Sequence, residues 1–131
     1  MCLTVAASAE AETIARCGEG WLEVIDGYPV LHLKGTPYEV GFQHGALLKE
    51  SVTANLNQII HAQAEKEMVE IGPISPTPRD AIEMIISIED RYVPDAYFEE
   101  LQGLADGSGL PIEDARVGNF IPELFHSSGF A

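Results

Sequence analysis

Two Thr-Pro pairs, Thr36-Pro37 and Thr77-Pro78, each mark the start of a helix. Proline suits the first helical position, and a preceding threonine can cap the free amides there. In Thr36-Pro37-Tyr38-Glu39 the hydroxyl can accept from the amide of Glu39 while the carboxylate returns to the threonine, which is a capping box. Asp80 falls in the first turn of the second helix, where the helix dipole favours negative charge. The chain is therefore predicted to be helical after each pair.

A stripe with helical spacing follows the first cap. Its members lie three or four residues apart and are Gly41, Gly45, Leu48, Val52, Leu56, Ile59 and Gln63. This spacing predicts one long helix, from Thr36 to about Val69. Glycine costs a helix about 1 kcal/mol relative to alanine, so we expect the Gly41/Gly45 pair to admit another backbone closely. The stripe has no evident partner in the sequence, which predicts poor stability for the chain alone.

The rest of the pattern predicts an α+β fold. Asp26-Gly27 separates two apolar runs and is typical of a hairpin turn, because both residues tolerate positive φ. The second helix should have Ala81, Ile82, Ile85, Ile86 and Glu89 along its inner edge. Further helices are expected over about 94–106, ending at Gly107-Ser108-Gly109, and over about 111–119. The fold class is thus an N-terminal β-hairpin followed by several α-helices.

Composition excludes some classes of function. The 131 residues suit one domain or part of one, and 46% of them are apolar. Acidic residues outnumber basic ones 21 to 7, and a net charge of −14 disfavours binding to nucleic acid or to anionic membranes. No run approaches the roughly 18 apolar residues that would span a bilayer. The two cysteines are too few for a disulfide framework.

The first residues, MCLTVAASAEA, allow two interpretations. The alternating small residues suit a signal-peptidase site, which would make the protein secreted or periplasmic. The basic segment of a signal peptide is absent, so an Ala-rich frayed terminus and a cytoplasmic protein are equally compatible. We assign residues 1–19 to an N-terminal tail.

The chemistry-bearing motifs are few. The sequence has no metal-ligand spacing, phosphate loop or nucleophile elbow, and its four histidines lie far apart. His32 and His61 are expected to be surface or core residues. Ser127-Ser128-Gly129, taken alone, is typical of a loop after a helix. Residues alone do not identify a function.

Two segments nevertheless carry a resemblance. They are YPVLHLKGTPYEVGFQHGALLKESV (28–52) and EELQGLADGSGLPIEDARVGNFIPELFHSSGFA (99–131). Together they resemble the autoproteolytic acyltransferase family of N-terminal-nucleophile (Ntn) hydrolases, the family of acyl-coenzyme A:6-aminopenicillanate acyltransferase. The match extends over about residues 20–131, and the order and spacing of its elements make it specific.

The resemblance implies a self-processing enzyme with a four-layer αββα sandwich. Residues 20–126 would be the pre-nucleophile region and 127–131 the start of the catalytic subunit, with autocleavage between His126 and Ser127. The family has a nucleophilic cysteine at this position, so Ser127 is either natural or an engineered replacement. The rest of the sandwich would come from a downstream chain of the same precursor, which forms a heterodimer with this region after cleavage.

The implied reaction is hydrolysis or transfer of an acyl group at the amide bond of a small substrate. Residue 127 would form an acyl-enzyme, and its freed α-amine, with an ordinary pKa of about 7.7 to 8.0, would serve as base. The chemistry needs no metal or cofactor. Possible supporting residues are Glu123, Ser128, His44 and Asn119. His44 is expected near a helix N-terminus, which would favour its neutral form.

Two other interpretations remain open. The chain could be a secreted or periplasmic helical interaction module without catalysis. It could also be an inhibitory propeptide that shields a nucleophile until it is cleaved.

Overall fold

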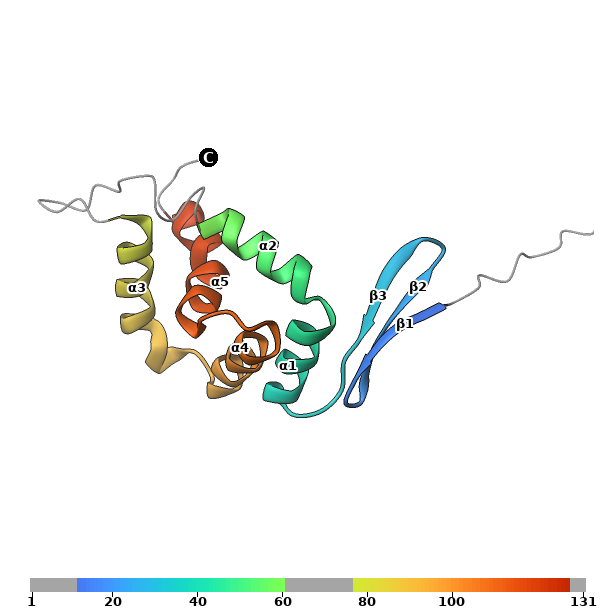
Figure 1. Cartoon of the computed structure of the whole chain (residues 1–131). Coiled ribbons are helices and arrows are strands. Elements are labelled where there is room, and N and C mark those ends of the chain that lie inside the picture. Colours follow the sequence, from blue (N-terminus) through green and yellow to red (C-terminus); the bar gives the residue numbers. More distant parts are fainter. Residues whose placement is uncertain (1–11, 61–76, 128–131) are drawn as a thin grey trace, which may run out of the picture.

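The computed structural model describes residues 12–60 and 77–127 (Figure 1). It confirms the α+β class: a small antiparallel sheet lies to one side of a group of packed helices. The elements in chain order are β1 (Glu12–Cys17), β2 (Gly20–Ile25), β3 (Tyr28–His32), α1 (Pro37–Leu47), α2 (Lys49–Ile59), α3 (Pro78–Glu89), the 3-10 helix η2 (Asp90–Tyr92), α4 (Asp95–Ser108) and α5 (Ile112–Ser127).

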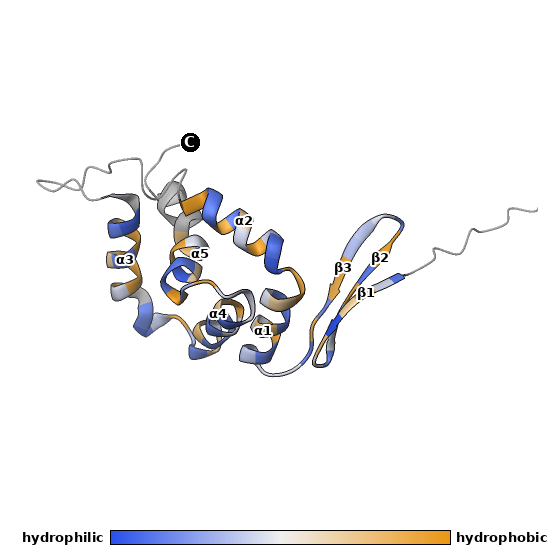
Figure 2. Ribbon diagram, in the orientation of Figure 1, coloured by the Kyte–Doolittle hydropathy of each residue, from blue (hydrophilic) through white to orange (hydrophobic). Residues whose placement is uncertain are grey.

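Several expectations lie outside these residues. They concern the possible cleavage site in MCLTVAASAEA, His61, Gln63 and the helix end near Val69. Within the described segments, no helix is both long and apolar enough to cross a membrane. Figure 2 shows apolar and polar residues interspersed along the helices.

The predicted hairpin is β2 and β3. Its two turn residues both have positive φ, 52° for Asp26 and 82° for Gly27, as a two-residue type I′ turn requires. The sheet also has a third strand, β1, in the order β1-β2-β3. This corrects the assignment of residues 1–19 to a tail, because residues 12–17 pair with β2. Strand β1 is an edge strand with mostly exposed side chains. It therefore needs no regular alternation of apolar and polar residues, which is the pattern by which a strand is predicted from sequence.

Both predicted helix starts are confirmed. The amide of Glu39 donates to Thr36 Oγ1 over 3.3 Å, and the amide of Thr36 donates to Glu39 Oε2 over 2.8 Å. Thr77 and Asp80 form the same reciprocal pair, with distances of 3.2 and 3.1 Å. The second start is therefore a full capping box, with aspartate in place of the usual glutamate.

The prediction of a single long helix after Thr36 is wrong, because the chain forms two helices there. Leu48, at φ −116° and ψ 27°, separates α1 from α2. Its amide still donates to His44 O over 3.1 Å, and its carbonyl accepts from Val52 over 2.9 Å, so the chain changes direction without losing these bonds. One non-helical residue preserves the three-and-four spacing, which is why the stripe in the sequence runs through the break.

The glycines of the stripe pack against α4, as the sequence predicts. A Cβ on Gly41 would meet the backbone carbonyl of Glu100, and one on Gly45 would meet that of Leu104. The fit is reciprocal, because Gly103 and Gly107 of α4 lie against backbone atoms of α1. The expectation that the stripe has no partner within the chain is thus wrong for its first part.

The second part of the stripe packs against α5 and α3. A Cβ on Gly118 would meet the Leu56 side chain. The buried apolar cluster joins Ile60, after α2, to α3 and α5 and consists of Ile60, Ala81, Ile82, Ile86 and Val117. These contacts cover the second part of the stripe only partly, since no residue of α2 is buried, and poor stability of the chain alone stays a prediction.

Of the last two helices, only α5 differs clearly in length from its prediction. Helix α4 matches its expected range closely and ends at Gly109, which has the left-handed φ of 81° typical of a glycine cap. Helix α5 runs to Ser127 instead of ending near Asn119. The sequence after Asn119 is therefore helical almost up to the serine pair.

Candidate functional site

The predicted cleavage site lies at the end of α5. Ser127 is the last residue of that helix, and Glu123 and His126 belong to its last turns. Side chains of α5 are described as far as Phe120, and Ser128 lies outside the described residues. The backbone thus gives the position of the predicted scissile bond, between His126 and Ser127, at a helix C-terminus.

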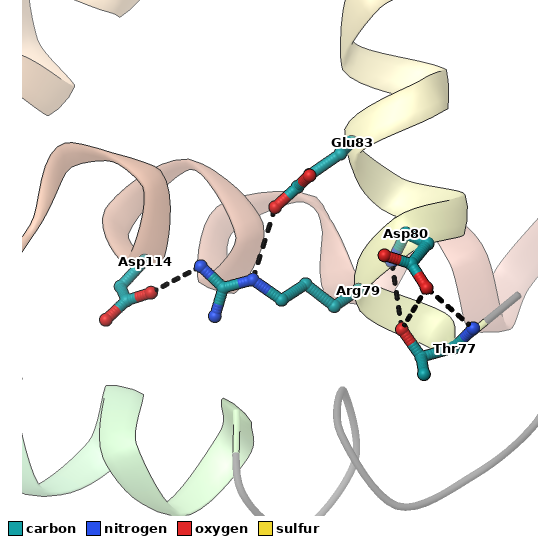
Figure 3. Close-up of polar contacts among 5 residues, drawn as sticks. All are labelled: Thr77, Arg79, Asp80, Glu83 and Asp114. Atoms are coloured by element: carbon teal, nitrogen blue, oxygen red, sulfur yellow. Dashed lines mark hydrogen bonds and ion pairs between the residues drawn. The ribbon is translucent and has the colours of Figure 1, made fainter.

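The start of α5 is held by an arginine of α3 (Figure 3). Arg79 Nη2 donates to Asp114 Oδ1 over 2.7 Å, and its Nε donates to Glu83 Oε1 over 3.2 Å. The bond to Asp114, followed by that to Glu83, raises the pKa of Arg79 despite its partial burial. Val117, one turn further, is almost fully buried against α3. These contacts fix the helix that leads to Ser127.

The supporting residues do not form one cluster in the described part of the chain. Asn119 is exposed on α5. His44 is half-buried in the last turn of α1, because the helix ends at Leu47. Its expected place near a helix N-terminus is therefore wrong. Among the described residues, no hydrogen bond or ion pair joins His44 to Asn119.

A buried glutamine at the junction of sheet and helices was missed by sequence reasoning. Gln43 Nε2 donates to Lys34 O over 2.7 Å, and Gln43 Oε1 accepts from Lys34 N over 3.0 Å. The Gln43 amide thus makes the two hydrogen bonds with the Lys34 backbone that a neighbouring strand would otherwise make. These bonds connect the segment after β3 to α1. The sequence gives little signal for this role, because Gln43 lies two residues from both Gly41 and Gly45 and so falls on the opposite face of the helix.

An open cavity of about 350 Å³ also lies at this junction. Cys17, Lys34 and Phe42 are among its lining residues. Lys34 Nζ lies 2.6 Å from Glu19 Oε2, and this hydrogen bond raises the pKa of the lysine. The charged pair bridges the β1–β2 turn and the segment before α1, so its place here is structural.

His32 is a structural residue of the sheet. Its ring stacks on Trp21 with centroids 4.2 Å apart, and its Nε2 lies 2.7 Å from Glu23 Oε1. The guanidinium of Arg16 lies 6.0 Å from the Trp21 ring centroid. Cross-strand pairs of this kind stabilise a sheet. Within the described segments, no three His, Cys, Asp or Glu side chains are grouped as a metal site would require.

Comparison with known proteins gives distant relatives. No protein-family profile matches the chain. Protein dcd1B of Dictyostelium discoideum is 30% identical over 109 residues, which cover 72% of this chain and 22% of that protein. Protein dcd1A of the same organism is 27% identical over 116 residues, covering 76% of this chain and 25% of the relative.

An uncharacterized protein of Archaeoglobus fulgidus is 25% identical over 119 residues, which cover 82% of this chain and 19% of the relative. The chain therefore spans about a quarter or less of the length of these relatives. Their names state no activity.

Proposed function

We propose that this chain is the pre-nucleophile portion of a self-processing Ntn amidohydrolase or acyltransferase. It would be cleaved between His126 and Ser127, and residue 127 would then carry the acyl-enzyme formed from an amide substrate. The oxyanion donors and most of the sandwich would come from a downstream chain. The alternating small residues of MCLTVAASAEA would suit a secreted or periplasmic location as part of the same proposal.

The observation that carries the proposal is that the two resembling segments pack as one unit. Segments 28–52 and 99–131 are far apart in sequence, yet α1 of the first crosses α4 of the second at glycines on both helices. Helix α5 then leads from this unit to residue 127. The relatives also extend far beyond the matched region, which leaves room in those proteins for a catalytic domain.

The chemistry of residue 127 suits this position. Its side chain would attack the carbonyl of His126, and water would cleave the resulting ester or thioester. A serine hydroxyl is a poorer nucleophile than a thiolate, so Ser127 should make cleavage slow. A cysteine at the same position should make it faster.

The test is Ser127→Cys in the longest natural polypeptide that contains this chain. We expect intact-mass spectrometry to show two fragments that meet between residues 126 and 127. Ser128→Cys is the matched control, because it places the thiol one residue later and should leave the bond after His126 intact. An uncleaved Ser127→Cys protein with a folded circular dichroism spectrum would refute the proposal.

A non-catalytic interaction module is favoured by a different observation. Several large apolar side chains are more than a third exposed, among them Ile14, Tyr28, Met84, Ile88, Tyr92 and Tyr97. Aromatic residues and methionine are enriched at protein–protein interfaces. A natural reading frame that stops directly after Ala131 would support the module, whereas several hundred further residues rich in short strands would support the enzyme.

A further inference from the structure

Helix α3 carries apolar side chains on more of its surface than its internal contacts use. Ala81, Ile82 and Ile86 are buried in the cluster that α3 forms with α5. Met84 and Ile88 of the same helix are 41% and 54% exposed. Since each residue turns a helix by about 100°, these two side chains widen the apolar arc of α3 to roughly 200°. An arc of about 100° is enough for a helix that packs on one side only.

The exposed apolar side chains of α3 form a row. Met84 and Ile88 lie four residues apart, and Tyr92, four residues further in η2, is 76% exposed. We call these three residues the outer stripe. The polar side chains beside it follow a separate line with the same spacing, Arg79, Glu83 and Ser87. Apolar side chains that are exposed together and bordered by polar ones mark a contact surface.

The outer stripe is small for an interface with a separate protein. A stable interface of that kind buries roughly 800 Å² on each partner and takes about 20–30 residues a side. Three side chains supply much less. A segment of the same polypeptide needs less contact, because a covalent connection gives it an effective concentration in the millimolar range. The area of the stripe therefore favours an occupant that is joined to this chain.

The relatives contain much polypeptide that could supply such a segment. The region that matches this chain is about a quarter or less of their length. Helix α3 lies at the end of the helical group that is farthest from the sheet (Figure 1). It packs on α5, the helix that ends at Ser127. A polypeptide that continues beyond α5 therefore leaves from a helix that is already in contact with α3.

We propose that the outer stripe docks an apolar segment of the polypeptide that follows residue 127 in the natural protein. Met84 and Ile88 contact apolar side chains of that segment, so that α3 packs on α5 with one part of its apolar arc and on the segment with the other. This inference rests on the proposed function only in requiring a downstream chain. It needs neither cleavage nor acyl transfer.

The test measures thiol reactivity in the longest natural polypeptide that contains this chain. Ile88→Cys places a thiol on the outer stripe, and Ser87→Cys, exposed on the polar line one residue earlier, is the matched control. Peptide mass spectrometry after brief treatment with N-ethylmaleimide measures the label at each position. We expect position 88 to react at least about tenfold more slowly than position 87, because the docked segment must first open locally. In urea the two should react alike.

Cross-linking identifies the occupant. With p-benzoylphenylalanine at position 84, we expect cross-links to a peptide beyond residue 127 of the same molecule. Cross-links only between isotope-labelled and unlabelled molecules would instead show a second copy on the stripe and overturn the proposal. Equal labelling of positions 87 and 88 in the folded protein would also overturn it. If Ile88→Cys fails to fold, Met84→Cys takes its place in the labelling experiment.

The two proposals can fail separately. A protected stripe in a polypeptide that Ser127→Cys leaves uncleaved would support docking and refute self-processing. Cleavage of Ser127→Cys together with an unprotected stripe would refute docking and leave self-processing supported.

Discussion

Single side chains in this protein act mainly by satisfying backbone groups. Thr36 and Glu39 close the start of α1, and Gln43 bonds both backbone groups of Lys34. The amide of Thr36, followed by its hydroxyl, donates to the Glu39 carboxylate and lowers its pKa below the ordinary value of 4.5. Ser127, in contrast, is placed by the helix that it ends.

The Glu39 carboxylate should make α1 sensitive to acid. A carboxyl group whose pKa is lowered by folding stabilises the protein above its unfolded pKa, and this stabilisation is lost as pH falls through the folded pKa. Urea unfolding at several pH values should therefore show the parent more stable than Glu39→Gln at neutral pH, with the difference shrinking as pH falls below the ordinary value of 4.5 and vanishing below the lowered pKa of the folded protein. Glu99→Gln, on exposed α4 surface, is the control. A difference that stays constant with pH would contradict the assignment.

Among the elements, α1 and α4 have the closest backbone approach that we describe. Glycines at Gly41, Gly45, Gly103 and Gly107 leave no room for a methyl group between the helices. Helix α5 is held differently, by the Arg79–Asp114 ion pair and by apolar burial. The first contact depends on backbone shape and tolerates no added atoms, whereas the second depends on side chains that can adjust.

Gly103→Ala should test this difference. The new Cβ would meet the backbone carbonyl of Tyr38, which cannot move without separating the helices. Overpacking costs about 1–3 kcal/mol, with this rigid site near the upper end, and alanine recovers about 1 kcal/mol of helix propensity. We expect a net loss of about 2 kcal/mol in the free energy of unfolding, measured with urea.

Gly118→Ala is the matched control on α5. Its methyl group would meet the end of the flexible Leu56 side chain, which can change rotamer. The loss of stability should be less than half of that for Gly103→Ala. Equal losses in the two variants would show that the α1–α4 contact is no tighter than an ordinary side-chain contact.

The whole molecule combines a helical group with a lightly attached sheet. Figure 1 shows the sheet beside α1, at the end of the chain segment that leads into this helix. The sheet is tied to the helices by Gln43 and by the buried Leu22. Its two edge strands, β1 and β3, each pair with β2.

Hydrogen exchange should reveal this division in the 131-residue chain. Amides of α1 and α4 at the glycine crossing should exchange most slowly, and those of β1 much faster, because an exposed edge strand opens locally. Mass spectrometry of peptides from residues 12–17, 37–47 and 95–108 would measure the three rates. Exchange from β1 as slow as from α1 would show that sheet and helices open as one unit.

The sequence by itself determined the features that depend on neighbouring residues. The two Thr-Pro caps, the Asp26-Gly27 turn and the glycine end of α4 follow from local φ preferences and hydrogen bonds, and all are found in the structure. The Gly41/Gly45 pair also predicted a close contact with another backbone, but it did not identify α4 as that partner.

Only the tertiary structure decided the features that depend on distant residues. Strand β1 exists through its pairing with β2, and Leu48 leaves the helix so that α1 packs on α4 while α2 reaches α5. The same break moved His44 from a helix start to a helix end. Local propensities leave such long-range contacts open, because burial of apolar surface across the whole chain selects among them.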